Sequence, residues 1–259
     1  LQVGATTEME FDGERIARRG VVLVSVNYRL NAFGFLAHPE LTEAADRGGA
    51  TNFGLLDQRA GIAWVRRNIA AFGGDPESIT VFGQSAGGRS TWMKVVSPMN
   101  RGLFRRAIVQ SGALDAGIAR YPLLAEAERA GEDFLEYLGV KTIAQARSLS
   151  ARELNAKTQA YRAWRWGPVI DGDFLPGTPA EILAAHREND VELMAGDTPD
   201  EVKGLRPVKS WEQFRGKMAP VYGAWWPELD ELTHVRSAEE LEAYYRSAGF
   251  NTFEIGNRY

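Results

Sequence analysis

The stretch "SITVFGQSAGGRS", residues 78–90, restricts the possible folds more than any other part of the chain. It begins with β-branched and aromatic residues, which favour a strand, and passes through GQSAG at 83–87 into a predicted helix. A strand that enters such a turn, followed by a helix that leaves it, presents the turn at the carboxyl edge of a sheet. We therefore expect an α/β fold with Ser85 exposed at that edge.

The segments around this turn follow the alternation of strand and helix that is typical of α/β proteins. The apolar run VVLVSVNY indicates a strand buried on both faces of a mostly parallel sheet. The sequence predicts strands at 21–28, 78–82, 105–112 and 191–197, and helices at 55–69, 90–96, 122–138, 142–159, 211–218 and 238–249. No internal repeat or flexible linker interrupts the chain, so a single domain over 1–259 is the simplest expectation.

Composition excludes several classes of function. The net charge of −4 and the isoelectric point near 5.6 argue against a nucleic-acid partner, which needs a basic face. The longest apolar run, at 21–26, is too short to cross a bilayer, so we expect no transmembrane segment. The absence of cysteine excludes disulfides, a thiolate nucleophile and cysteine-based metal sites. No residue cluster implies a metal or organic cofactor, and neither location nor oligomeric state is predicted.

The GQSAG turn supplies some of the parts that a serine nucleophile needs. Gly83 and Gly87 are expected because side chains there would collide with the neighbouring strand and helix, and Gln84 completes the turn. The backbone N–H of Ala86 is available as a donor to an oxyanion. A serine also needs a base that removes its proton, and a third group that orients the base. The alternative is that Ser85 only caps a helix.

At this point the chain resembles the type-B carboxylesterases, an α/β-hydrolase family that includes the cholinesterases and the bacterial para-nitrobenzyl esterases. The resemblance covers roughly residues 12–201 and lies in four stretches, in the order of the family: VNYRLNAFGFLAHPEL, TNFGLLDQRAGIAWVRRNIAAFGGDPESITVFGQSAGG, FRRAIVQSG and GPVIDGDFLPGTPAEIL. It implies a central, mostly parallel sheet flanked by helices and incomplete at both ends. It also implies that the helical residues 122–160 form a cap-like insertion over the site.

The resemblance assigns roles to individual residues. It implies that Ser85 is the nucleophile, Ala86 an oxyanion amide and Glu201 the acid of the triad. The family has glycine after that acid where this chain has Val202, so a surface carboxylate at a helix start is the alternative for Glu201. Ser111 matches a supporting serine, or only fills a turn after a strand.

Two further matches concern the scaffold and the base. Arg29 and Asp57 match an ion pair of the family, which we interpret as structural. His38 and His186 precede the acid, in segments that the family does not use for catalysis. His234 follows Glu201 closely and lacks the small residue that the family has after its histidine, so a surface loop is the better interpretation.

Two parts of the family's site are not in the sequence. The His-Gly-Gly-Gly loop would fall before Leu1, and the histidine base would fall beyond Tyr259. We therefore expect a piece of a longer esterase: a carboxylic ester hydrolase that acts through an acyl-enzyme on Ser85, inactive or impaired as this piece.

Other interpretations stay open. One is a non-catalytic binding or adhesion homologue on the same fold, and another is a truncated product that does not fold. The expected partner is a small carboxylic ester. Four tryptophans either line an ester pocket or pack in the core and cap: Trp164, Trp166, Trp225 and Trp226.

Overall fold

The computed structural model of the chain describes residues 1–45, 51–112 and 121–196, with single positions and pairs between 210 and 240. The chain divides into two compact units. One contains residues 1–80, 93–106 and 121–192, and the other contains 81–92, 107–120 and 193–259. Half of the predicted helix 211–218 and most of the predicted helix 238–249 fall outside the described residues.

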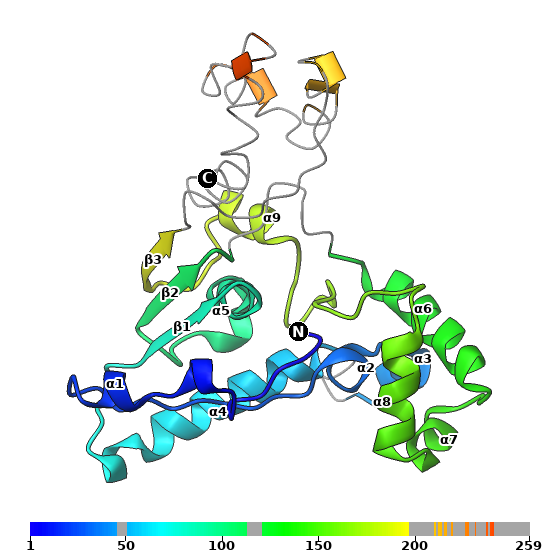
Figure 1. Cartoon of the computed structure of the whole chain (residues 1–259), viewed down its shortest axis with the longest axis horizontal. Coiled ribbons are helices and arrows are strands. Elements are labelled where there is room, and N and C mark those ends of the chain that lie inside the picture. The colour runs from blue at the N-terminus through cyan, green and yellow to red at the C-terminus, as the bar shows by residue number, and fades with distance from the viewer. Residues whose placement is uncertain are drawn as a thin grey trace. The chain divides into compact units, whose positions relative to one another are not determined.

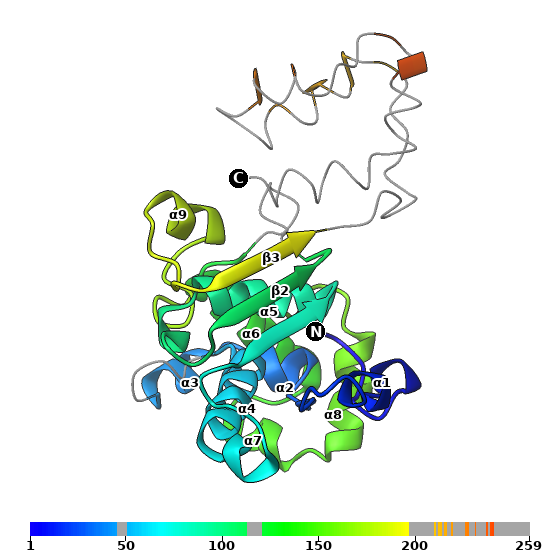
Figure 2. The same cartoon turned by 90° about the vertical axis from the view of Figure 1, so that its left-hand side faces the viewer.

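The second unit contains most of a three-stranded sheet. Its strands are β1 (Thr80–Gln84), β2 (Arg106–Gln110) and β3 (Glu192–Gly196), in the order β1-β2-β3. Figure 2 shows the three arrows side by side and pointing in the same direction, and helix α5 (Ala86–Val96) lies along one face of the sheet in both views. The parallel sheet predicted around the GQSAG turn is confirmed, with α5 starting four residues earlier than expected.

The first unit is mainly helical, and it confirms the helices predicted at 55–69 and 122–138. The helix predicted at 142–159 is instead two helices, α7 (Ile143–Ser148) and α8 (Ala151–Ala160), separated by Leu149 and Ser150, because the Ser150 side chain caps the start of α8. The longest helices of this unit, α4 (Phe53–Asn68) and α6 (Leu124–Leu138), bury apolar side chains at helical spacing. The elements of this unit are η1 (Met9–Phe11), α1 (Glu14–Ala17), α2 (Asn31–Phe35), α3 (Pro39–Glu43), α4 (Phe53–Asn68), η2 (Ile69–Phe72), η3 (Pro98–Asn100), α6 (Leu124–Leu138), α7 (Ile143–Ser148), α8 (Ala151–Ala160) and α9 (Pro179–Ala184). Figure 1 shows α6, α7 and α8 gathered together.

The strand predicted at 21–28 is wrong for the structure. Residues 21–30 form no strand, and the side chains of Val21, Val22 and Val24 are exposed. A strand needs a neighbour for its backbone N–H and C=O groups, and no described residue hydrogen-bonds to the backbone of 21–26. Two of the five apolar residues at 21–26 are partly buried, since Leu23 lies against Gly13 and Val26 against Gly61.

The core of the first unit depends on close backbone approaches and on buried amides. A Cβ atom at Gly131 of α6 would lie 1.8 Å from the carbonyl oxygen of Ala37, so only glycine fits there. Asn52, buried in left-handed conformation at φ +57°, exchanges hydrogen bonds of 2.9 and 2.8 Å with the N–H and C=O of Val169. These contacts fix the segment that follows α8.

Asn189 ends helix α5 from a distant part of the chain. Its side-chain amide donates to the carbonyls of Lys94 at 2.9 Å and Ser97 at 2.8 Å, and its backbone N–H donates to Val95 at 2.9 Å. The last carbonyls of a helix have no partner within it, so a buried helix end needs donors from elsewhere. Asn189 supplies three of them and is itself buried.

Of the four tryptophans singled out in the sequence, Trp166 and Trp226 are buried and Trp164 is partly buried. Trp166 is buried, and its ring lies edge-on to Phe134 at 5.0 Å and near Tyr161 at 6.4 Å. Trp164 packs against the core cluster of Ala37, Ala127 and Val169. Trp226 is also buried, whereas Trp225 lies outside the described residues. Core packing is therefore the role of Trp164 and Trp166 in this structure.

Candidate active site

Ser85 lies in the turn between β1 and α5, at the carboxyl end of the strand. Its φ is +52°, a left-handed value that non-glycine residues adopt only under constraint. The backbone N–H of Ser85 donates to the carbonyl of Gln110 at 2.9 Å, and its own carbonyl accepts the N–H of Arg89 at 2.8 Å. The turn is therefore held by β2 on one side and by the first turn of α5 on the other.

The reactive face of the turn is open. Ser85 and Ala86 are exposed, and within the described part of the chain neither the Ser85 hydroxyl nor the Ala86 N–H has a hydrogen-bond partner. An exposed hydroxyl beside an unused backbone donor is the arrangement that a serine nucleophile and an oxyanion require. The same observation means that no described side chain is bonded to Ser85 as its base.

The glycines of the turn do not all act as predicted. A Cβ atom at Gly83 would lie 2.5 Å from the carbonyl carbon of Gly87, so the collision expected at Gly83 is confirmed. The collision expected at Gly87 is wrong, because no described atom lies within 4 Å of a Cβ atom there. Gly87 faces open space in the first turn of α5.

Gly88, which the GQSAG pattern does not include, is the glycine that contacts the end of β2. A Cβ atom at Gly88 would lie 2.6 Å from the carbonyl oxygen of Gln110, the atom that holds Ser85. A Cβ atom at Gly112 would lie 2.3 Å from the carbonyl carbon of Gly88. The signal was present in the sequence as a second glycine inside a helix, which costs about 1 kcal/mol in propensity and needs a packing reason.

This contrast predicts opposite effects for two adjacent Gly→Ala substitutions. Gly88→Ala is expected to destabilise the chain by about 1–3 kcal/mol, because the new methyl group must displace the end of β2. Gly87→Ala, the matched control, is expected to stabilise it by up to about 1 kcal/mol through helix propensity alone. Urea denaturation of the two variants measures the difference, and equal changes in both would contradict it.

Ser111 occupies the equivalent turn after β2. It is buried, has φ +52°, and its N–H donates to the carbonyl of Gly196 at the end of β3 at 2.8 Å. The ends of the three strands are thus joined through Ser85 and Ser111. Glu201, the predicted acid, lies five residues after β3 and, like Val202 and His234, outside the described residues.

The remaining predicted residues lie in the first unit and have structural partners there. The Arg29 guanidinium holds both carboxylate oxygens of Asp57 at 2.7 and 2.8 Å, and the Arg29 N–H donates to the same carboxylate at 3.0 Å. Burial alone would raise the pKa of Asp57, but these hydrogen bonds and the charge of Arg29 lower it overall. His38 caps α3, since its Nδ1 accepts the N–H of Glu40 at 3.2 Å.

The described residues contain neither a candidate metal site nor a helix that could span a membrane. Across 1–45, 51–112, 121–196 and the scattered later positions, no group of histidine and carboxylate side chains is arranged to hold a metal ion. Among the helices of the same residues, none has the length and hydrophobicity to cross a membrane.

Comparisons with known proteins connect this turn to a family. The model of the Carboxylesterase family matches residues 1–218. Bile salt-activated lipase of Rattus norvegicus is 43% identical over 199 residues, which are 72% of this chain and 31% of that protein. Para-nitrobenzyl esterase of Bacillus subtilis (strain 168) is 36% identical over 210 residues, 77% of this chain and 41% of that protein. The chain therefore spans less than half the length of either relative.

The fold agrees with the sequence match. A solved PNB esterase superposes with a TM-score of 0.76 at 31% identity, covering 98% of this chain and 54% of that chain. A second, described as thermophilic, superposes with a TM-score of 0.71 at 30% identity, covering 97% and 53%. The parallel sheet, the turn at Ser85 and these matches together show that the chain belongs to the carboxylesterase family and has its α/β-hydrolase fold.

Proposed function

We propose that this chain is part of a carboxylic ester hydrolase in which Ser85 is the nucleophile. The Ser85 oxygen forms a bond to the ester carbonyl carbon while its proton passes to a base, and the alcohol leaves with that proton. Water then releases the acid from the acyl-enzyme. The observation that carries this proposal is the left-handed backbone of an exposed serine whose hydroxyl has no hydrogen-bond partner among the described residues, because a serine that only capped a helix would not need that strain.

The proposal gives Ala86 and Glu201 the remaining roles in this chain. The N–H of Ala86, which has no hydrogen-bond partner among the described residues, would donate to the oxyanion, a contribution typically of about 3–4 kcal/mol to the transition state. The carboxyl ends of parallel strands meet at one edge of a sheet, so a residue soon after β3 is well placed to serve a site that begins at β1. Glu201 would orient the base, with Ser111 in a supporting position.

We further propose that residues 1–259 form one α/β-hydrolase domain, with the helices of 122–160 as its cap. This segment contains α6, α7 and α8, and the buried ring of Phe134 in α6 lies 5.1 Å from the ring of Tyr161, which directly follows α8. Substrate choice would then depend on these helices. We propose a small carboxylic ester as the substrate, because the similar proteins are named as a bile salt-activated lipase and a para-nitrobenzyl esterase.

The 259 residues by themselves are expected to show no turnover that depends on Ser85. The sequence contains no His-Gly-Gly-Gly stretch, and no described side chain is bonded to the Ser85 hydroxyl as a base. The measurement compares the rates at which this chain and its Ser85→Ala variant hydrolyse p-nitrophenyl acetate. Circular dichroism checks that both are folded. The expected rates are equal and close to the background.

If the folded chain hydrolysed the ester and Ser85→Ala abolished that activity, the assignment of the base would change. The base would then belong to these residues, and His234 would be the first to replace, since His38 is engaged in capping α3. His234→Ala and His186→Ala would separate the two remaining histidines. That outcome would keep Ser85 as the nucleophile and overturn the proposed inactivity of the chain.

A further inference from the structure

We propose that the end of helix α5 is a binding site for at least one internal water molecule, which joins three segments of the first unit. The residues that would hold it are Ser97, directly after α5, Asn100, at the end of η3, and Asn189, shortly before β3. All three are buried, with 0%, 1% and 5% of their surface exposed. This proposal does not depend on Ser85 or on ester hydrolysis.

The side chains of these residues contain four buried polar atoms that have no hydrogen-bond partner among the described residues. They are Ser97 Oγ, both amide atoms of Asn100 (Oδ1 and Nδ2), and Asn189 Oδ1. Leaving a buried polar atom unpaired costs free energy, so nearly all such atoms in native proteins bond to a protein group or to ordered water. Four of them in three residues therefore indicate a shared partner.

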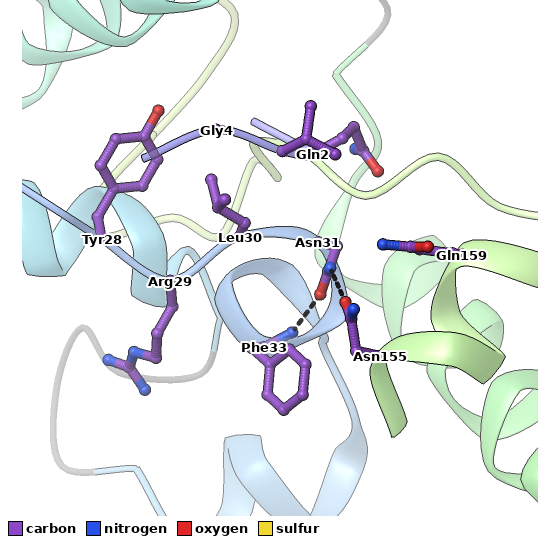
Figure 3. A pocket seen from close by; sticks show the side chains of 10 residues that line it. Gln2, Gly4, Tyr28, Arg29, Leu30, Asn31, Phe33, Asn155 and Gln159 are labelled. Atoms are coloured by element: carbon purple, nitrogen blue, oxygen red, sulfur yellow. Dashed lines mark hydrogen bonds between the residues drawn. The ribbon is translucent and has the colours of Figure 1, made fainter. Parts of the chain in front are cut away.

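Other buried asparagines of the first unit are paired within the protein. Asn31 is one example, since its Nδ2 donates to Asn155 Oδ1 at 3.1 Å (Figure 3). Asn52 is another, and its Nδ2 and Oδ1 both take part in hydrogen bonds of 2.8 to 2.9 Å. Asn100 is at least as deeply buried as Asn31, yet neither atom of its amide has such a partner in the described part of the chain.

The carbonyl oxygen of Ser97 brings the three residues together. It accepts Asn189 Nδ2 at 2.8 Å and the backbone N–H of Asn100 at 3.1 Å. Covalent geometry then keeps all four unpartnered atoms within about 8 Å of this oxygen. No two of the four hydrogen-bond to each other, although the hydroxyl and the amide N–H groups could donate to either amide oxygen. A buried water typically makes about three hydrogen bonds and can bridge groups that do not reach one another.

The four atoms form a mixed set of donors and acceptors. Asn100 Nδ2 only donates, the two amide oxygens only accept, and the Ser97 hydroxyl can do both. A cation would leave the N–H groups of Asn100 unpaired, and an anion would leave the oxygens of Asn100 and Asn189 unpaired. Because water both donates and accepts, it can complete such a set, and the chemistry of the site therefore favours water over an ion.

A water at this position would connect the end of α5 to η3 through side chains that do not bond to each other. Asn189 already donates to the carbonyls of Lys94 and Val95, so the water would extend that contact to Ser97 Oγ and Asn100. Since all the residues that would hold the water are buried, we expect it to exchange with the solvent more slowly than the protein tumbles.

The test measures the oxygen-17 relaxation of water in a solution of the chain as a function of magnetic field. The amplitude of its dispersion reports the water molecules that are held longer than the protein tumbles. Asn100→Leu keeps the approximate shape of the side chain and removes two polar atoms that have no partner among the described residues. We expect this variant to lose the amplitude of at least one water. In the unmodified ¹⁵N-labelled chain, we expect nuclear Overhauser effects between water and the side-chain amide protons of Asn100.

Asn68→Leu is the matched control, because it makes the same substitution at a partly exposed position, where the amide donates to the carbonyl of Trp64 at 2.8 Å. Its dispersion amplitude is expected to equal that of the unmodified chain. The Overhauser measurement needs no variant, so it decides the proposal if Asn100→Leu does not fold.

A cation is the alternative occupant to exclude, because Glu188 Oε2 is also buried without a partner among the described residues. Three results would each overturn the proposal: no Overhauser effect from water to Asn100, equal amplitudes in Asn100→Leu and the unmodified chain, or a saturable shift of the Asn100 amide signals with NaCl or KCl that choline chloride does not produce. None of these readouts depends on turnover, so failure of the proposed esterase function leaves the test unaffected.

Discussion

Ser85→Ala is expected to lower ester turnover by roughly 10⁴- to 10⁶-fold in a protein that supplies the rest of the site. A suitable host is a chimera in which this chain replaces the matching segment of the Bacillus subtilis para-nitrobenzyl esterase. The loss follows because an alanine methyl cannot form the acyl-enzyme, whatever base is present. Steady-state hydrolysis of p-nitrophenyl acetate gives kcat and KM, and the decrease is expected in kcat.

Ser78→Ala provides the control in the same chimera. It makes the same chemical change shortly before β1, where the Ser78 hydroxyl accepts only a surface hydrogen bond from Arg106 at 3.2 Å. Its kcat is expected within about twofold of the parent. If Ser85→Ala retained more than about a tenth of the parent kcat while folding normally, Ser85 would not be the nucleophile, and the non-catalytic interpretation of this chain would gain support.

Lys94→Met is expected to stabilise the chain by about 2–4 kcal/mol at pH 6 to 7. Lys94 is fully buried in the last turn of α5, and that burial lowers its pKa to about 7. Its ammonium group contacts the side-chain oxygen of Gln58. A lowered pKa means that the folded state disfavours the charged form, so the charge opposes folding wherever the unfolded lysine is protonated.

The direction of the pH dependence follows from the difference between the pKa values of Lys94 in the folded and unfolded chain. Between about pH 7 and pH 10 the unfolded chain binds a proton at Lys94 that the folded chain does not, so stability rises with pH over that range. Below pH 7 both states carry the proton and the full cost is present. Urea denaturation at pH 6, 8 and 10 should show the gain from Lys94→Met shrinking as pH rises.

Lys157→Met is the control for Lys94→Met, because Lys157 of α8 is only partly buried. Its effect is expected to stay within about 0.5 kcal/mol and to show no trend with pH. A destabilised Lys94→Met at pH 6 would mean that the ammonium group has a compensating partner that outweighs its burial. Lys94→Met also removes the hydrogen bond that the ammonium group donates to the buried side chain of Gln58. The lower end of the expected gain in stability allows for the cost of that lost hydrogen bond.

The sequence predicted the sheet around the GQSAG turn because local and long-range preferences agree there. Thr80, Val81 and Phe82 have high strand propensity, and Gly83 leaves room for the backbone of Gly87 at the start of the following helix. Helices α4 and α6 were predicted for the same reason. The strand predicted at 21–28 does not form. These residues have strong strand propensity, but no described strand lies beside them to pair with their backbone N–H and C=O groups.

Only the part of the candidate site that is formed by neighbouring residues in the sequence could be predicted. Ser85 and Ala86 are adjacent, so their arrangement could be inferred from a single turn. The contact of Gly112 with Gly88 depends on how β2 passes the start of α5, and spacing alone does not reveal it. Likewise, nothing in the composition of α5 distinguishes the buried Lys94 from a solvated lysine, because burial is a property of the packed helix.

The contact between Asn189 and the end of α5 has a consequence for the order of folding. The amide of Asn189 and the carbonyl of Lys94 are 95 positions apart in the chain. At about 5–20 residues per second, a ribosome would take roughly 5–19 s to synthesise that interval. During this time α5 can form with its first turns and the Ser85 bend in place, while its last carbonyls remain bonded to water. Closure of the helix end is therefore a late step, and a pause in translation before Asn189 would prolong the period in which the buried end of α5 is uncovered.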